Sequence, residues 1–246
     1  MIKAIRNIGK YLILLKKTFA RPEKTLVYYR QTLREIENHG IGSILIVVIV
    51  SIFVGAAITI QTNYNIENPL LPSYLVGVAV RDSLLLEFSS TMIGLVLAGK
   101  IGSSIASEIG MMRVTEQIDA LEVMGINAPG YLILPKIIAT VFFTPMLCVI
   151  SVGMGLIGGY LVCLIGDVIP VHEYKLGIQY SFYPHYLSYA MIKTAFYGFI
   201  ISTLSAYHGF HVQGGAVEVG KASTRAVVLS CILILLADLV LTNIIL

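Results

Sequence analysis

The sequence predicts an all-α polytopic membrane protein with about five transmembrane helices, preceded by an amphipathic interfacial helix. The first observation is composition: 57% of the 246 residues are hydrophobic and 13% are charged, with a mean hydropathy of +0.84. A soluble domain carries about 25% charged residues. The second observation is a set of five apolar stretches, each near the ~20 residues that a bilayer-spanning helix needs. The chain therefore has too little polar surface for a soluble protein.

The five apolar stretches define the predicted spans. The third is longer than one crossing requires and too short for two crossings with a turn, and Pro145 within it favours one kinked or tilted helix. In the same stretch, Gly155 and Gly159 form a small-xxx-small pair that permits close helix contact. The spans cover roughly residues 41–61, 79–100, 136–165, 187–207 and 226–246.

The segment before the first span predicts two amphipathic helices. Apolar residues recur at three- and four-residue spacing from Ile2 and Ile5 to Phe19, and together they form an apolar stripe. Lysine and arginine lie outside this stripe. This pattern is typical of a helix in the membrane interface, with its basic face toward anionic headgroups. Pro22 is expected to end it, and a second stretch starts at Leu26. We expect residues 1–38 to form this interfacial or cytoplasmic unit and residues 39–246 the permease transmembrane domain; the alternative is two solvated helices.

Lysine and arginine predict the orientation, because they gather in short cytoplasmic loops. The amino-terminal segment holds nine of the seventeen, and the segments 100–136 and 208–225 hold five more. By contrast, 62–75 has none and 166–186 has only Lys175. The amino terminus is therefore expected in the cytoplasm, and five spans place the carboxyl terminus outside.

Two segments resemble nucleotide-binding loops. GLVLAGKIGS, residues 94–103, matches G-x-x-x-x-G-K-[ST] except for Ile101 at the hydroxyl position, and the near match recurs at 215–222. A phosphate loop needs a strand that leads into free backbone N–H groups at a helix start, whereas Gly94 lies within an apolar stretch. We therefore expect no ATP site, no catalytic residue and no cofactor in this chain.

Neither cysteine nor histidine spacing predicts a metal site. The three cysteines fall in apolar runs without C-x-x-C spacing, so a disulfide framework or a zinc site is not expected. His208 and His211 have H-x-x-H spacing, but two ligands without a third make a poor metal site.

The segment 107–135 is far more polar than its flanks and reads SEIGMMRVTEQIDALEVMGINAPGYLILP. Its apolar residues keep helical spacing beside an acidic rim. We therefore expect a short amphipathic cytoplasmic helix, closed by Gly125 and by Pro129. Such a helix could pack on its own bundle or dock in the groove of a partner.

This segment also resembles a known family. AGKIGSSIASEIGMMRVTEQIDALEVMG, with GGAVEVGKASTRAVV at 214–228 and DLVLT at 238–242, is similar to the MlaE-type permeases of ABC phospholipid transporters, from about residue 40 to the end. The resemblance implies a homodimeric permease for phospholipid, without affinity for nucleic acid, in the inner membrane of a diderm bacterium. It further implies a separate cytoplasmic ABC ATPase that holds ATP and magnesium, a periplasmic MCE-domain protein that carries lipid onward and, in some members, a STAS-domain protein.

The resemblance implies that the segment 107–135 couples to the ATPase. The AGKIGS element would then be a helix end that leads into this segment. One departure concerns the second span, where the family commonly has an Arg-Glu pair followed by Gly-Pro. The aligned residues here include Leu86 and Glu87, so only the glutamate is carried over. Arg81 could replace the arginine only if the helix extends that far. The coupling candidates are Glu108, Arg113, Glu116, Asp119, Glu122, Met124 and Gly125.

Three ionisable residues, Glu87, Lys193 and Asp238, lie within predicted spans, where a charge costs at least about 2.5–3.5 kcal/mol. At 1.5 Å per residue, Glu87 and Lys193 both fall about 10 Å below the outer boundary, and Asp238 lies closer to the middle. We expect them to line a lipid cavity between two protomers, with headgroups near Glu87 and Lys193; structural pairing between helices is the alternative. The alternative function is an ion-coupled secondary transporter that uses the three residues as a relay, a class that usually has two similar halves.

Overall fold

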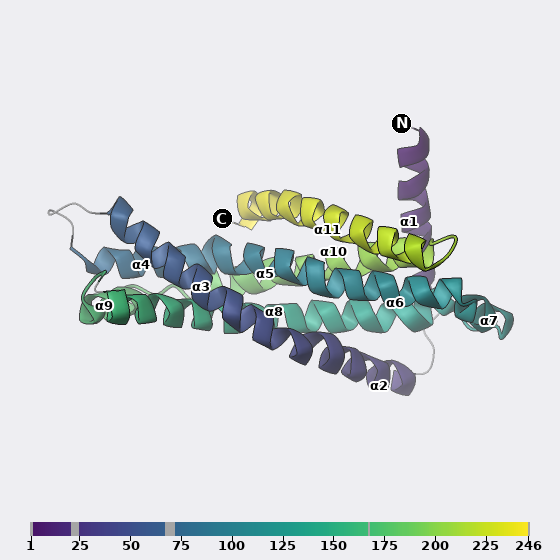
Figure 1. Ribbon diagram of the computed structural model, residues 1–246, viewed down its shortest axis with the longest axis horizontal. Helices are drawn as coiled ribbons and strands as arrows, with labels where there is room; N and C mark the ends of the chain where they lie inside the picture. The colour runs from purple at the N-terminus through teal and green to yellow at the C-terminus, as the bar shows by residue number, and fades with distance from the viewer. Residues whose placement is uncertain (1, 21–24, 67–71, 167, 246) are drawn as a thin grey trace.

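The computed structural model describes residues 2–20, 25–66, 72–166 and 168–245, and these ranges form an elongated bundle of helices without a strand (Figure 1). Pro22 lies outside the described residues, as do the side chains of Ile2 and Ile5. The α-helices are α1 (Ile2–Ala20), α2 (Thr25–Glu35), α3 (Gly42–Asn65), α4 (Tyr74–Ser83), α5 (Ser89–Leu97), α6 (Ser103–Val114), α7 (Gln117–Val123), α8 (Ala128–Gly166), α9 (Val171–Gln179), α10 (His185–Phe210) and α11 (Ala216–Ile245).

Three π-helical turns join some of these helices end to end. They are η1 (Ile36–Ile41), η2 (Leu84–Phe88) and η3 (Ala98–Gly102). A π-helical turn is an insertion in an α-helix and is frequent at functional sites. Five continuous helices are then long and apolar enough to cross a membrane: Tyr28–Asn65, Tyr74–Val114, Ala128–Gly166, His185–Phe210 and Ala216–Ile244.

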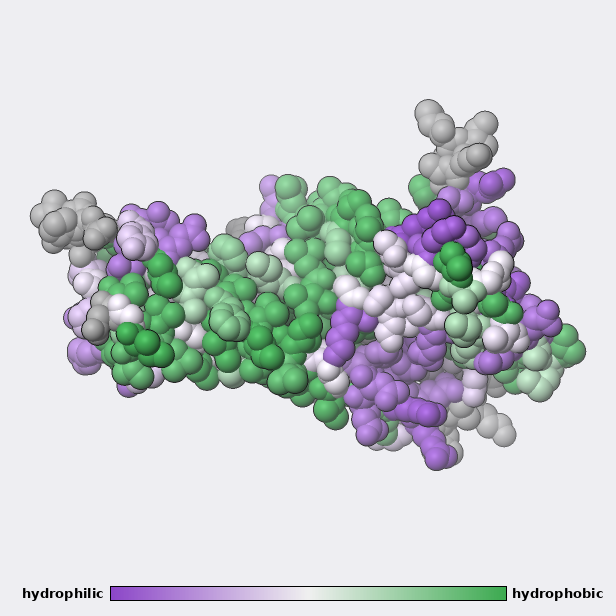
Figure 2. All heavy atoms as spheres, in the orientation of Figure 1, coloured by the Kyte–Doolittle hydropathy of each residue, from purple (hydrophilic) through white to green (hydrophobic). Residues whose placement is uncertain are grey.

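The five-helix membrane architecture predicted from the sequence is confirmed. Figure 2 shows a hydrophobic belt across the middle of the bundle, with hydrophilic residues gathered toward both ends. We name these ends after α7 and α9, which lie at opposite extremes in Figure 1. The amino-terminal helix α1 lies at the α7 end, and the carboxyl end of α11 points away from it.

Helix α8 is the centre of the bundle and packs most extensively against α3 and α10. It is a single helix that contains Pro135 and Pro145, as predicted for the third span. Its contact with α3 is backbone to backbone, because a Cβ atom on Gly55 would collide with the backbone of Gly155 and one on Gly158 with that of Ile52. The predicted close helix contact in this stretch is therefore confirmed.

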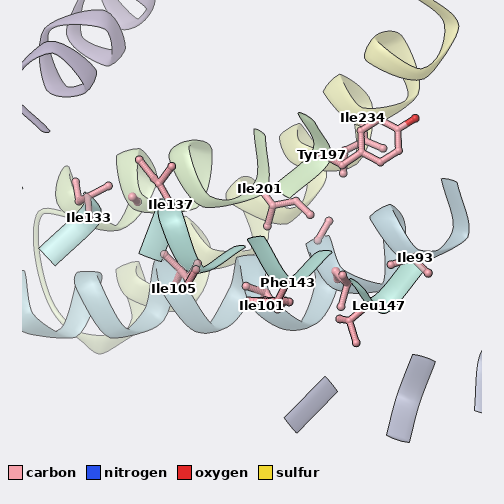
Figure 3. Packing of buried hydrophobic residues seen from close by; sticks show 14 of the residues in the cluster. Ile93, Ile101, Ile105, Ile133, Ile137, Phe143, Leu147, Tyr197, Ile201 and Ile234 are labelled. Carbon is pink, nitrogen blue, oxygen red and sulfur yellow. The ribbon is translucent and has the colours of Figure 1, made fainter. Parts of the chain in front are cut away.

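The main core lies where α5, α6, α8, α10 and α11 meet (Figure 3). Branched aliphatic side chains dominate it, and they pack closely where the inward faces of these helices meet. The buried residues labelled in Figure 3 are Ile93, Ile101, Ile105, Ile133, Ile137, Phe143, Leu147, Tyr197, Ile201 and Ile234.

The polar segment 107–135 is not one short helix. The second span continues through η3 as far as Val114, so AGKIGS is not a helix end. A separate helix, α7, covers only Gln117–Val123, and Pro129 lies in the first turn of α8 instead of closing the preceding helix. The physical reason is that Pro is well accommodated at a helix start, where its missing N–H would have no partner. The second amphipathic stretch likewise continues through η1 into the first span, so the proposed boundary at residue 38 falls within a helix.

Candidate functional site

The three charged residues predicted within the spans meet at one point. The Lys193 Nζ atom of α10 lies 2.8 Å from Glu87 Oε2 of η2 and 2.5 Å from Asp238 Oδ1 of α11. The Lys193 side chain is 0% exposed, that of Asp238 is 11% exposed and that of Glu87 is 44% exposed. We call these three residues the Lys193 cluster. Its two ion pairs connect three of the five spans.

Neighbouring polar side chains complete this cluster, and they were not predicted from the sequence. Tyr197 donates a hydrogen bond to Asp238, while Thr242 accepts hydrogen bonds from Lys193 at 3.1 Å and from Tyr189 at 2.8 Å. Tyr189 and Tyr197 lie four residues on either side of Lys193, and Thr242 lies four residues after Asp238. Residues four apart share a helix face, so this spacing is the signal by which they could have been found.

The arrangement leaves Glu87 as the accessible member of the cluster. Lys193 is enclosed by two carboxylates, a hydroxyl and, at 3.3 Å, the carbonyl oxygen of Leu86. Its ammonium group therefore has no surface on which a ligand could bind. Glu87 keeps one side exposed, next to the exposed side chains of Phe88 and Met92. Two carboxylates share one ammonium, so the cluster carries a formal surplus of negative charge when both are ionised.

A small apolar cavity of about 10 Å³ lies between α3 and the η2–α5 helix, and Glu87 does not line it. Its walls include Val50, Val54, Phe88 and Met92. The hydroxyl of Ser89 also lines it, and this buried oxygen has no hydrogen-bond partner among the described residues. This space is about the size of one water molecule, so it is not a binding groove for lipid.

Arg81 does not replace the arginine that the family commonly has next to this glutamate. The helix does extend through Arg81, but its side chain is buried and points to the α9 end of the bundle. Its guanidinium donates hydrogen bonds to the carbonyl oxygens of Ile178 at 3.0 Å and Tyr180 at 2.6 Å, and it pairs with Asp82 at 2.8 Å. Arg81 therefore fixes the end of α9 on α4.

At the opposite end, the predicted coupling residues form a projecting corner. Two left-handed residues, Glu116 (φ 59°) and Gly125 (φ 78°), bound α7. Arg113 on α6 pairs with Asp119 on α7 at 2.5 Å, which holds the corner closed. The tip is apolar and exposed: Val123 is 89% exposed, and Met124 beside it is also exposed. Glu122 accompanies them on the surface.

Glu108, the remaining coupling candidate, belongs to a different arrangement. The Lys136 Nζ atom of α8 lies 2.7 Å from Glu108 Oε2 of α6 and 2.7 Å from Glu35 Oε1 of α2. We call these three residues the Lys136 cluster. His39 contacts Glu35 at 3.2 Å, so Glu35, His39 and Glu108 could together offer ligands to a metal ion. The Lys136 ammonium already occupies the position between the two carboxylates that such a cation would take.

Comparison with known proteins agrees with this arrangement. The family described as Permease MlaE matches residues 32–244. A protein of Rickettsia bellii named "Probable ABC transporter permease protein" is 34% identical over 98% of this chain and 93% of its own length. The chloroplastic protein TRIGALACTOSYLDIACYLGLYCEROL 1 of Arabidopsis thaliana is 33% identical over 89% of this chain and 63% of its own length.

A further relative comes from Haemophilus influenzae and is named "Intermembrane phospholipid transport system permease protein MlaE". It is 25% identical over 99% of this chain and 94% of its own length. The family match covers nearly all of the first span, the other four spans and both charged clusters. The chain therefore belongs to the MlaE permease family and is an ABC-type permease.

Proposed function

We propose that this chain is the membrane-spanning subunit of an ABC-type phospholipid transport system. It moves lipid between the inner membrane of a diderm bacterium and a periplasmic MCE-domain carrier, and a separate cytoplasmic ATPase supplies the energy. The observation that carries the proposal is the continuous helix Tyr74–Val114. It joins the turn that holds Glu87 to the projecting corner at α7.

The corner at α7 is the proposed docking site of the ATPase. Exposed apolar side chains on a short rigid helix fit a groove on a partner protein, and Val123 and Met124 are the most exposed of them. Arg113 and Asp119 hold the corner in shape, while Glu116 and Gly125 supply its turns. ATP and magnesium belong to the partner, and in some assemblies a STAS-domain protein binds that ATPase.

The lipid path is proposed between two copies of this chain. Helix α11 is the least buried of the five spans, with Leu235, Leu236 and Leu239 exposed, so it offers an apolar face to a second protomer. Lipid tails would lie on the exposed apolar side chains of Phe88 and Met92, with the headgroup near the exposed Glu87 carboxylate. In this arrangement Lys193 and Asp238 position Glu87 and do not touch the headgroup.

The alternative function is ion-coupled secondary transport through the Lys193 cluster. One observation favours it: two carboxylates share one ammonium, which leaves a carboxylate that could take up a proton. The two functions differ in their energy source, which is ATP hydrolysis by a partner in the first and an ion gradient in the second. A measurement of the energy source therefore decides between them.

The experiment compares two serine variants at the α7 end. Val123→Ser combined with Met124→Ser removes the apolar tip, and Tyr29→Ser removes an equally accessible aromatic side chain on α2. The tip variant is expected to bind the purified ATPase roughly 30-fold more weakly, a hot-spot effect of about 2 kcal/mol, and to lose ATP-driven lipid transfer in proteoliposomes. The α2 variant should bind as the unmodified chain does. Unchanged ATPase binding by the tip variant, or gradient-driven transfer without any ATPase, would overturn the proposal.

A further inference from the structure

An apolar groove lies at the α7 end of the bundle, away from Glu87. It has a volume of about 410 Å³ and is enclosed by α1, α10 and α11. Its walls are apolar and include Ile8, Leu12, Leu204, Leu229 and Leu233. None of the residues that line it belongs to the Lys193 cluster.

This apolar groove borders a basic cavity. The cavity has a volume of about 540 Å³, and Asn7, Tyr207 and His208 line both spaces. The two spaces are therefore adjacent. Four cationic side chains line the cavity against one carboxylate, that of Glu218. The cations are Lys10, Arg113, Lys221 and Arg225.

Two of these cations are available to a ligand. Lys221 pairs with Glu218 at 2.6 Å, and Arg113 pairs with Asp119 at 2.5 Å. Within the described part of the chain, no carboxylate lies within ion-pair distance of Lys10 or Arg225. Both side chains belong to exposed residues. A surplus of unpaired positive charge at the mouth of an apolar groove is complementary to an anionic amphiphile.

The groove is built by specific contacts of α1. The Tyr11 hydroxyl donates a hydrogen bond to Thr203 Oγ1 at 2.9 Å, and its ring packs edge-on against Tyr207. Farther along, the Asn127 side-chain amide donates to the carbonyl oxygen of Lys17 at 2.9 Å. These contacts hold α1 on α10 and α8, so the walls of the groove have fixed positions.

The charge of the cavity comes from lysine and arginine and not from histidine. Burial lowers the pKa of the His211 imidazole below its usual range, and the positive charges of Lys10 and Arg113 lower it further. His211 is then neutral at physiological pH. Its Nδ1 atom lies 3.0 Å from the carbonyl oxygen of Tyr207, so the ring also helps to shape the cavity wall.

We propose that these two adjacent spaces together hold one anionic phospholipid as a resident lipid. An acyl chain lies along Ile8, Leu204 and Leu233, and the headgroup phosphate lies between Lys10 and Arg225. The lipid fills the space between α1 and the bundle, and it would fix the position of α1 relative to Arg113 and the α7 corner. This site is separate from the proposed transport path and does not depend on it.

The test measures lipid retention by the full chain in detergent, using native mass spectrometry with added phosphatidylglycerol or phosphatidylcholine of identical acyl chains. The unmodified chain is expected to retain phosphatidylglycerol preferentially. Each basic residue near an anionic lipid contributes about fivefold in affinity, so Lys10→Glu is expected to lower phosphatidylglycerol retention roughly tenfold or more. Lys16→Glu, on an exposed residue of the same helix outside both spaces, should leave it unchanged.

A second pair of variants tests the acyl-chain groove. Leu233→Trp fills the groove and is expected to reduce retention, whereas Ile232→Trp, on an exposed residue outside the groove, should not. An excess of inorganic phosphate should fail to displace the lipid, because the acyl chain holds it. Equal retention of the two lipids, wild-type retention by Lys10→Glu, equal losses in both members of either pair, or displacement by phosphate alone would each overturn the proposal.

Discussion

The chain uses the same charge arrangement at two depths. In the Lys193 cluster and in the Lys136 cluster, one lysine lies between two carboxylates from two other helical elements. Both lysine side chains are buried, at 0% and 3% exposure, and each cluster has one half-exposed glutamate, Glu87 or Glu108. The surroundings differ. The Lys193 cluster lies among apolar spans, whereas the Lys136 cluster borders an open cavity of about 740 Å³ at the α7 end.

This difference shows that surroundings, and not the pairing pattern, determine what such a cluster costs and does. Removing one partner from a buried ion pair leaves a charge without compensation. Beside the open cavity, water can solvate the remaining carboxylates, which limits that cost. Among the spans, water cannot do so. The two clusters therefore provide matched sites at which the same substitution should have unequal effects.

The largest effect is expected for Lys193→Ala. It leaves Glu87 and Asp238 facing each other without their shared cation, and it should lower the free energy of unfolding by about 3–5 kcal/mol. Denaturant-induced unfolding in a fixed detergent or bilayer measures this loss. Lys175→Ala, at an exposed residue of α9, is the control and should change little. If Lys193→Ala lowers the free energy of unfolding no more than Lys175→Ala does, the Lys193 cluster is hydrated.

An intermediate effect is expected for Lys136→Ala. The two carboxylates lose their partner beside the open cavity, so the loss should be about 1–3 kcal/mol. The same unfolding measurement applies. The loss should also shrink in high salt, because salt screens charges that water can reach, whereas that of Lys193→Ala should not. An equal or larger loss than at Lys193 would contradict the comparison.

The smallest effect on stability is expected for the paired substitutions Glu87→Gln and Glu108→Gln. Each keeps the shape of a half-exposed side chain, so the free energy of unfolding should change by less than about 1 kcal/mol. Their functional effects should differ. Glu87→Gln is expected to reduce lipid crosslinking to a photoreactive group at Met92 several-fold, and Glu108→Gln to leave it unchanged. Identical crosslinking in both variants would remove Glu87 from the lipid path.

The sequence was sufficient to predict the architecture because a bilayer imposes a length and a composition on each span. Five apolar stretches, the single helix through Pro145 and the close contact around Gly155 follow from rules that involve few residues. The charge of Lys193 and Glu87 within spans was also sufficient to predict that they need partners. The structure shows the ion pair between them, which was the alternative to a shared lipid cavity; their role toward lipid stays a prediction.

The helix ends and the partner of Lys136 could not be predicted. Polar residues after residue 100 mark the point where the chain leaves apolar surroundings, but a helix continues there as long as its backbone bonds are satisfied, and here it reaches Val114. The ion pairs of Lys136 join residues 28 and 101 positions away. No local spacing indicates such a pairing, because it depends on how α2, α6 and α8 pack.

The length of the helix Tyr74–Val114 has a mechanical consequence. Its 41 residues extend about 60 Å at 1.5 Å per residue, roughly twice the hydrocarbon thickness of a bilayer. A movement imposed at its α7 end would therefore be transmitted along one continuous helix to the turn that carries Glu87. The two π-helical turns η2 and η3 are the places in this helix where the backbone hydrogen bonding departs from the α-helical pattern, and η2 carries Glu87.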